Sequence, residues 1–461
     1  MEVMSPLDSA FLRLEDRHTS LHIASIAVFD GPPPTYEEIA GLFVAKLPML
    51  PRYRQRVREV PLQLGRPVWV DDPQFSLRNH LRHTALPRPG STAQLRELVG
   101  RLMSQQLDRS RPLWDSWIVE GLEDGRWALI NKVHHCMVDG IAGTDLLSAV
   151  LDHSPEPSPP VPASRRATAE PGRLRLLASA AAALPRHPAG VLRQASASVR
   201  HPRATATAVL ARLHGMLDFV ELARPATASS LSGSLGSARC WAGAQVSLDD
   251  VRIIRRGLGG TVNDVVLAAV TRGFRDLLLS RDEPPARHAV RTLVPVSVRT
   301  SRQSGQADNR ISAVVAELPV HVADPVERLR AVRTELDRLK ASGEAAAGGV
   351  VTELASYVPP MLLSAGLTGI FRVPQRFVVT VATNVRGPRT PLYAAGRRLR
   401  ELYPYVPIAD RLRIGVAVSS YAGALYFGIT ADRDSTPDVD VLIAGIEDGL
   451  RELVKAAEQQ S

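Results

Sequence analysis

Two adjacent histidines, His134 and His135, end an apolar run that begins at Trp127, and Asp139 follows four residues after the second histidine. Such a run predicts a β-strand, whose end holds a side chain rigidly and still leaves it accessible. A neutral imidazole accepts a proton from a hydroxyl group near neutral pH, so the pattern predicts general-base catalysis.

Strand geometry predicts different positions for the two histidines. Successive side chains of an extended chain point to opposite faces, so one imidazole faces the reaction space and the other packs inward. By the same alternation, Cys136, the one tempting nucleophile, is expected on the face opposite His135. Asp139 precedes Gly140 and a predicted helix, and we expect it to cap that helix or to pair with an arginine such as Arg299.

Other chemistries fit the sequence less well. Zinc binding is a poorer account of His134 and His135, because their side chains diverge and further ligands are not evident. The chain contains no GxSxG, GxGxxG or Walker motif, which disfavours serine-hydrolase and nucleotide-dependent reactions. We therefore expect neither a metal nor a redox cofactor.

The segment from His134 to Gly140 reads His-His-Cys-Met-Val-Asp-Gly and resembles the HHxxxDG motif of coenzyme A-dependent acyltransferases. Chloramphenicol acetyltransferase-like enzymes and peptide-synthetase condensation domains share that motif. Further segments along nearly the whole chain resemble the bacterial wax ester synthase/diacylglycerol acyltransferase family: Pro6-Leu-Asp-Ser-Ala-Phe-Leu, Arg111-Pro-Leu-Trp-Asp-Ser-Trp, Thr261-Val-Asn-Asp-Val-Val-Leu-Ala, Val294-Pro-Val-Ser-Val-Arg, Asn384-Val-Arg-Gly-Pro and Ser420-Tyr-Ala-Gly-Ala-Leu-Tyr-Phe-Gly.

The resemblance implies an α/β (α+β) fold of two chloramphenicol acetyltransferase-like domains, with His135 as general base in a channel between them. Acyl-coenzyme A is the implied acyl donor, and diacylglycerol or a long-chain alcohol is the implied acceptor. Oxyanion donors are expected from Asn263 or from backbone N–H groups of the turn from Gly140 to Gly143. The family's Asn-Asp pair places Asp264 beside Asn263 near the site.

Two of these assignments have a structural alternative. Thr261 followed three residues later by Asp264 is also the pattern of a helix N-cap. The sequence Pro112-Leu113-Trp114 is expected to form a hydrophobic wall of the site, and it fits an ordinary core equally well.

The chain also departs from the family pattern at two places. Ser20-Leu21-His22 stands where the family tends to have Pro-Met-His, and Val385-Arg-Gly-Pro replaces Val-Pro-Gly-Pro. The first change is expected to affect the entrance of the lipid channel, and the second the turn after Asn384.

Composition along the chain predicts an N-terminal domain over residues 1–160, a basic helical connector over 161–239 and a C-terminal domain over 240–461. Both domains alternate short strands with amphipathic helices. Predicted strands are Leu21 to Phe29, Trp127 to His135, Arg291 to Val298, Ile311 to Leu318, Arg376 to Thr383, Arg413 to Ser420 and Ala424 to Ile429. Predicted helices are Tyr36 to Ala45, Thr92 to Gln105, Val262 to Leu279, Pro325 to Lys340 and Val439 to Glu458.

Charge is concentrated in the connector. The chain carries a formal net charge of +9, and residues 161–225 hold ten arginines against Glu170, Asp218 and Glu221, a balance of +7. Nucleic-acid-binding motifs do not accompany this charge, so we expect an anionic membrane or lipid-droplet surface as the partner, and no nucleic acid. The N-terminus lacks the pattern of a secretory signal, and the chain lacks a spanning apolar run, which favours the cytoplasm.

The sequence as a whole favours an enzyme that acylates diacylglycerol, with long-chain alcohols as further acceptors. A condensation-type acyltransferase that uses a carrier-protein thioester or a specialised-metabolite acceptor is the alternative within enzymes. A non-catalytic coat protein of lipid bodies is the alternative outside them, and the intact His135 and Asp139 argue against it.

Overall fold

The structure is a computed structural model. It describes residues 2–61, 64–137, 149–156, 171–172, 174–178, 230–297, 311–341, 378–409 and 411–460. Every strand and helix that was given bounds above occurs in the structure, with ends shifted by a few residues at most sites. The predicted strand Arg376 to Thr383 differs most, because β11 (Thr380–Val385) begins later and extends further. Regular alternation and helical periodicity therefore located these elements well.

One six-stranded sheet has the order β12-β13-β2-β7-β6-β5. Its strands are β12 (Tyr393–Ala394), β13 (Arg397–Tyr405), β2 (His22–Phe29), β7 (Trp127–His134), β6 (Trp114–Glu120) and β5 (Leu81–Ala85). Neighbours are antiparallel except β5 and β6, which run parallel. A small sheet of β1 (Glu2–Val3), β4 (Val68–Asp71) and β3 (Gln55–Arg58) lies beside it.

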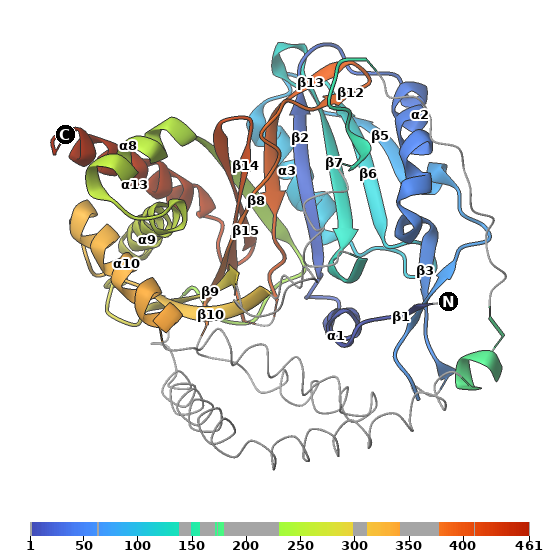
Figure 1. Ribbon diagram of the computed structural model, residues 1–461, viewed down its shortest axis with the longest axis horizontal. Helices are drawn as coiled ribbons and strands as arrows, with labels where there is room; N and C mark the ends of the chain where they lie inside the picture. The colour runs from blue at the N-terminus through green and yellow to red at the C-terminus, as the bar shows by residue number, and fades with distance from the viewer. Residues whose placement is uncertain are drawn as a thin grey trace, which may run out of the picture.

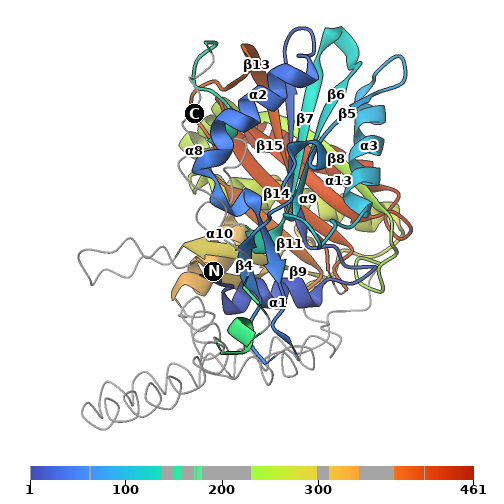
Figure 2. The ribbon, with the colours of Figure 1, turned by 90° about the vertical axis from the view of Figure 1, so that its right-hand side faces the viewer.

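Helices cover both faces of β7, which explains why its sequence is a continuous apolar run. Leu129 belongs to the core that includes α2 (Tyr36–Lys46), and Ile130 belongs to the core that includes α3 (Thr92–Ser104). Figure 2 shows these two helices on opposite sides of β6 and β7. All eight residues of β7 are buried, so the strand is a rigid support for the residues that follow it.

The second six-stranded sheet has the order β10-β9-β11-β14-β15-β8. Its remaining strands are β8 (Arg239–Ser247), β9 (Val290–Ser297), β10 (Ile311–Leu318), β14 (Ile414–Tyr421) and β15 (Ala424–Asp432). Four helices pack on one face of it, namely α8 (Leu248–Leu258), α9 (Val262–Ser280), α10 (Pro325–Ala341) and α13 (Val439–Glu458). The largest hydrophobic core lies between these helices and this sheet (Figure 1).

The two sheets are joined by more than the chain between them. Strand β13 pairs antiparallel with β2, with Leu402 opposite Ala27, so a late part of the chain completes the sheet that carries β7. Helix α3 packs on this first sheet and also on Trp241 of β8 in the second sheet. The division at residue 160 lies outside the described ranges, and residue 239 is the first residue of β8, so the proposed domain limits remain predictions.

Little of the predicted connector is described. Residues 174–178 are helical, and Leu176 packs against Val68 and Val70 of β4. Residues 204–222, whose composition favours a helix within the connector, lie outside the described residues. In the ranges that the structure describes, no helix is both long and apolar enough to cross a membrane.

Candidate active site

The strand that carries the histidine pair ends one residue earlier than predicted. Strand β7 ends at His134, and His135 begins a single 3-10 turn, η6 (His135–Met137). The turn forms because the Cys136 N–H donates a hydrogen bond back to His134 Nδ1 at 3.1 Å, which closes the chain on itself. The His135 N–H donates to the carbonyl of Leu21, the residue before β2, at 2.9 Å, so this backbone contact still supports the histidine.

His135 has the more accessible of the two imidazoles. Its residue is partly buried, and its ring lies 4.4 Å from the ring of Phe11 on α1 (Pro6–Leu14), measured between centroids. Burial is the main cause that lowers the pKa of His135 below 6.5; its own carbonyl opposes this change, and neighbouring His134 adds to it. The imidazole is therefore neutral at pH 7, the state that a general base requires.

His134 lies fully buried, at 0% exposure. The Leu113 carbonyl accepts its backbone N–H at 2.9 Å, and its Nε2 atom lies 3.6 Å from Oε2 of Glu15. The two histidines thus have different surroundings, as the sequence predicted, with His134 on the inward side.

Cys136 corrects one part of the sequence argument. Because His135 and Cys136 lie in η6 and not in β7, strand alternation does not describe their directions. Cys136 is 3% exposed within the first-sheet core, and burial raises the pKa of its thiol. A thiol in such surroundings is a poor nucleophile.

Several predicted residues cannot be placed. Asp139, Gly140, Gly143 and Arg299 lie outside the described residues, as does the helix expected after Gly140. Their proposed roles therefore stay predictions.

Asn263 and Asp264 lie in the first turn of α9, where they have different tasks. Asp264 forms a capping box: its Oδ2 accepts the Thr261 N–H at 2.7 Å, and its own N–H donates to Thr261 Oγ1 at 3.3 Å. This is the N-cap alternative weighed above. Asn263 Oδ1 lies 3.5 Å from Asn384 Nδ2, so the structure brings together the two asparagines of separate motifs. Among the described residues, Asn263 shares no hydrogen bond with His135.

The predicted hydrophobic wall is part of the core of the first sheet. Trp114 is 1% exposed, its Nε1 donates to the Tyr53 carbonyl at 2.9 Å, and its ring stacks on His80. Leu113 contributes through its carbonyl, which holds the backbone of His134.

Two family models match the chain. Residues 4–266 match the "Wax ester synthase/diacylglycerol acyltransferase catalytic domain", and residues 307–454 match the "WS/DGAT C-terminal domain". The chain belongs to the wax ester synthase/diacylglycerol acyltransferase family. The family predicted from the sequence and its acyltransferase class are thereby confirmed.

Similar proteins agree over the full length. A protein of Mycobacterium tuberculosis named "Probable diacyglycerol O-acyltransferase tgs1" is 42% identical over 468 residues, which cover 100% of this chain and 97% of that protein. A second protein of M. tuberculosis, named tgs2 with the same activity, is 31% identical over 470 residues and 99% of both chains.

Solved structures confirm the predicted fold class. The wax ester synthase/diacylglycerol acyltransferase of Marinobacter aquaeolei VT8 aligns with a TM-score of 0.67 and 25% identity, covering 99% of this chain and 100% of that one. A starter condensation domain of rhizomide synthetase in complex with C8-CoA aligns with a TM-score of 0.59 and 15% identity, over 100% and 95% of the two chains. The second likeness shows a shared fold alone.

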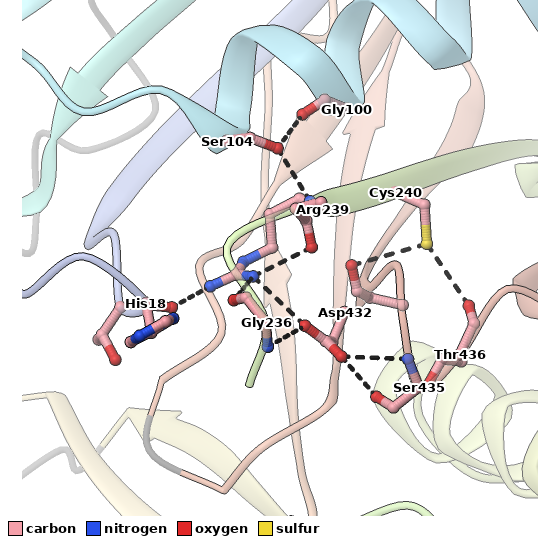
Figure 3. Close-up of polar contacts among 12 residues, drawn as sticks. His18, Gly100, Ser104, Gly236, Arg239, Cys240, Asp432, Ser435 and Thr436 are labelled. Atoms are coloured by element: carbon pink, nitrogen blue, oxygen red, sulfur yellow. Dashed lines mark hydrogen bonds and ion pairs between the residues drawn. The ribbon is translucent and has the colours of Figure 1, made fainter. Parts of the chain in front are cut away.

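This member of the family also carries a buried ionic contact between two neighbouring strands of its second sheet (Figure 3). Arg239 of β8 lies 3.5 Å from Asp432 of β15, and their side chains are 3% and 1% exposed. The Arg239 guanidinium also donates to the carbonyls of Gly236, at 2.8 Å, and His18. Its backbone N–H donates to Ser104 Oγ at 2.8 Å, at the end of α3. Arg239 thereby ties the second sheet to α3 and to the loop that leads into β2.

The sequence analysis did not identify Glu15 and Arg109 as neighbours of the histidine pair. It named His22 only as part of a segment that departs from the family pattern. The pairing of β2 with β7 places His22 directly opposite His134. Two histidines at facing ends of neighbouring predicted strands are the signal that would have drawn attention to His22.

Proposed function

We propose that the protein moves a fatty acyl group from coenzyme A to the hydroxyl of diacylglycerol, and that long-chain alcohols are further acceptors. Membership of the family and the names of its relatives support this proposal. The observation that carries it is His135, a partly buried imidazole of lowered pKa, held at the end of a fully buried strand. That group is what an acyl transfer to a hydroxyl requires of the protein.

In the proposed reaction, neutral His135 takes the proton of the acceptor hydroxyl as its oxygen attacks the thioester carbonyl carbon. The tetrahedral intermediate then collapses, the carbon–sulfur bond breaks and coenzyme A leaves as a thiolate. The imidazolium returns its proton to that thiolate, so the base is restored. None of these reaction steps requires a metal ion or a redox cofactor, and we propose that the enzyme uses neither.

The oxyanion of the intermediate needs hydrogen-bond donors. Asn263 remains our side-chain candidate, because its Oδ1 accepts from Asn384 Nδ2 while its own amide group can still donate a hydrogen bond. Backbone N–H groups from Gly140 to Gly143 are the other candidates. We propose that Asp139 orients the same loop by capping or ion pairing and does not exchange protons.

An acyl-transfer assay tests the proposed function. Purified protein receives palmitoyl-coenzyme A with either diacylglycerol or hexadecanol, and chromatography resolves the products. Formation of triacylglycerol in the first reaction supports the proposal. A parallel reaction replaces palmitoyl-coenzyme A with a carrier-protein thioester as the acyl donor. Product formed only from that thioester, or no ester product at all, would contradict the proposal. Added chelator should leave the rate unchanged.

The pH dependence of kcat/KM should report the base. A protonated imidazole cannot accept a proton, so the rate should fall as pH falls through the pKa of His135. Because that pKa lies below 6.5, the midpoint should lie below about pH 6.5 and the rate should be level near pH 7. Initial rates between about pH 5 and about pH 8 measure this. A midpoint above pH 6.5 would contradict the assignment.

Acid unfolding must be measured on the same samples. Burial lowers the pKa of His22 from 6.5 to about 4, so the unfolded chain binds a proton that the folded chain resists. Stability from this group should therefore decline as pH falls from 6.5 toward about 4. Circular dichroism at each pH separates this loss of fold from protonation of the base.

We further propose that the enzyme binds anionic membrane or lipid-droplet surfaces from the cytoplasmic side through residues 161–225. The +7 balance of that segment supports the proposal. Each arginine near an anionic surface contributes about 1 kcal/mol, and salt screens the attraction.

Sedimentation with lipid vesicles measures this binding. We expect binding to anionic vesicles that weakens with salt, and weak binding to neutral vesicles. Replacing Arg165 and Arg166 with glutamine should reduce binding, whereas the same change at Arg252 and Arg256 of α8 should not. Equal binding to both vesicle types would refute an electrostatic contact.

A further inference from the structure

A buried carboxylate lies behind the histidine pair. Glu15 is the C-cap residue of α1, where the chain leaves the helix in an extended conformation, and its side chain is 2% exposed. Burial of a carboxylate is costly unless the charge has partners and hydrogen bonds. Its surroundings therefore indicate what keeps it there.

Three side chains surround the Glu15 carboxylate. His22 Nε2 lies 2.8 Å from Oε1, Arg109 Nη2 lies 2.8 Å from Oε2, and His134 Nε2 lies 3.6 Å from Oε2. His22 and His134 face each other across β2 and β7, with ring centroids 5.7 Å apart. The carboxylate thus joins the end of α1 to the two central strands of the first sheet.

Hydrogen bonding determines where the proton of His134 resides. Its Nδ1 accepts the Cys136 N–H at 3.1 Å, so Nδ1 carries no proton. In the neutral ring the proton is then on Nε2, the atom that faces Glu15. A negatively charged oxygen at that position favours this tautomer over the other one.

The charge state of Glu15 agrees with this tautomer. Burial acts to raise the pKa of its carboxyl, but the close contacts with the imidazoles of His134 and His22 outweigh burial and hold that pKa well below its ordinary range. Arg109 adds a positive charge at 2.8 Å. Among the described residues no group of three or more His, Cys, Asp or Glu side chains is suited to hold a metal ion, so this cluster is not a metal site.

The same contacts determine the position of His135. The hydrogen bond from Cys136 to His134 closes η6, and His135 is the first residue of that turn. The His135 N–H is held by Leu21, in the loop that runs from Glu15 to His22. If His134 took the other tautomer, Nδ1–H would oppose the Cys136 N–H and the turn would have to open.

We propose that Glu15 is a positioning residue for the general base: by fixing the tautomer of His134 it keeps η6 closed and His135 in its reactive position. The expected effect on turnover rests on the proposed function. The tautomer of His134 rests only on its hydrogen bond from Cys136 and its contact with Glu15.

The decisive substitution is Glu15→Gln. A glutamine amide can donate to Nε2, which permits the other tautomer of His134, whereas Glu15→Asp keeps an acceptor-only carboxylate. Displacement of a catalytic group by about 1 Å costs on the order of 100-fold in rate. We therefore expect kcat of Glu15→Gln to fall about 10- to 100-fold, with KM for acyl-coenzyme A within about twofold and Glu15→Asp less impaired.

Glu317→Gln is the matched control. Glu317 lies 2.5 Å from Nδ1 of His288, and the histidine side chain is 61% exposed, so this is the same pair of residue types on the surface. The control should keep the turnover of the unmodified chain. Melting temperatures of all variants show whether lost activity reflects lost fold.

A second measurement needs no substrate. Nitrogen NMR of protein with labelled histidines reports which ring nitrogen carries the proton, and His134→Asn identifies the signal. We expect a bare Nδ1 in the unmodified chain and in Glu15→Asp, and a protonated Nδ1 or a mixture in Glu15→Gln. A protonated Nδ1 in the unmodified chain, or unchanged kcat in Glu15→Gln, would overturn the inference. If the unmodified chain forms no ester products, the proposed function is refuted. The NMR result for His134 would then decide whether Glu15 fixes the tautomer.

Discussion

His135→Ala should reduce kcat by about 10²- to 10⁴-fold, which is the usual contribution of a general base. The fold should persist, because His135 is only partly buried and lies in a turn beyond the end of β7. KM for acyl-coenzyme A should change little, since the base acts in the transition state. Steady-state rates with palmitoyl-coenzyme A and diacylglycerol, measured beside melting temperatures, provide the comparison.

His83→Ala is the matched control for this substitution. His83 lies on the exposed side of β5, away from the histidine pair, and its replacement should leave kcat unaltered. A His135→Ala protein that keeps more than about a tenth of normal turnover would exclude His135 as the base.

The same preparation distinguishes direct transfer from an acyl-enzyme. Cys136 is buried and the pKa of its thiol is raised, so Cys136→Ala should remain active. Intact-mass spectrometry after mixing enzyme with acyl-coenzyme A alone should show no stable adduct. An adduct that Cys136→Ala removes, together with ping-pong kinetics, would require a covalent mechanism instead.

Elements with strong local patterns were predictable from the sequence. Helix α13 has the predicted bounds, Val439–Glu458, because its apolar residues recur at helical spacing along twenty residues. Strand β7 was visible because it is buried on both faces and therefore apolar throughout. The strand pattern predicted one inward and one accessible histidine, and the resemblance to the HHxxxDG motif assigned the accessible position to His135.

Features that depend on contacts between residues far apart in the sequence were not predictable. Strand β13 (Arg397–Tyr405) mixes charged and apolar residues and is only partly buried, so it lacks the alternation that marks a strand. Its partner β2 is far away in the sequence, and only tertiary pairing makes it part of the first sheet. Glu15 was missed for a similar reason. An acidic residue after a helix is usually solvated, and its partners Arg109 and His134 are remote in the sequence.

Arg239→Met should lower the free energy of unfolding by about 3 to 5 kcal/mol, the usual cost of removing one partner of a buried ion pair. Arg239 and Asp432 are almost fully buried, and the remaining carboxylate cannot regain water. Hydrogen bonds from Gly236 N–H at 2.8 Å and Ser435 Oγ at 2.6 Å would still hold Asp432, but they do not replace the charge. Urea unfolding measures the loss.

A double substitution separates the ion pair from the loss of packing. If an unpartnered Asp432 charge causes most of the effect, adding Asp432→Asn to Arg239→Met should restore part of the stability. Removing the exposed pair between Arg252 and Asp249 by Arg252→Met should cost less than about 1 kcal/mol, because water solvates both ends. Two results would show that the Arg239 contact contributes by packing alone. One is an equal loss of unfolding free energy in Arg239→Met and Arg252→Met, and the other is a fully additive loss in the double variant. The loop that holds Leu21 and Glu15 also contacts Arg239 through the His18 carbonyl, so kcat of Arg239→Met should fall together with its stability.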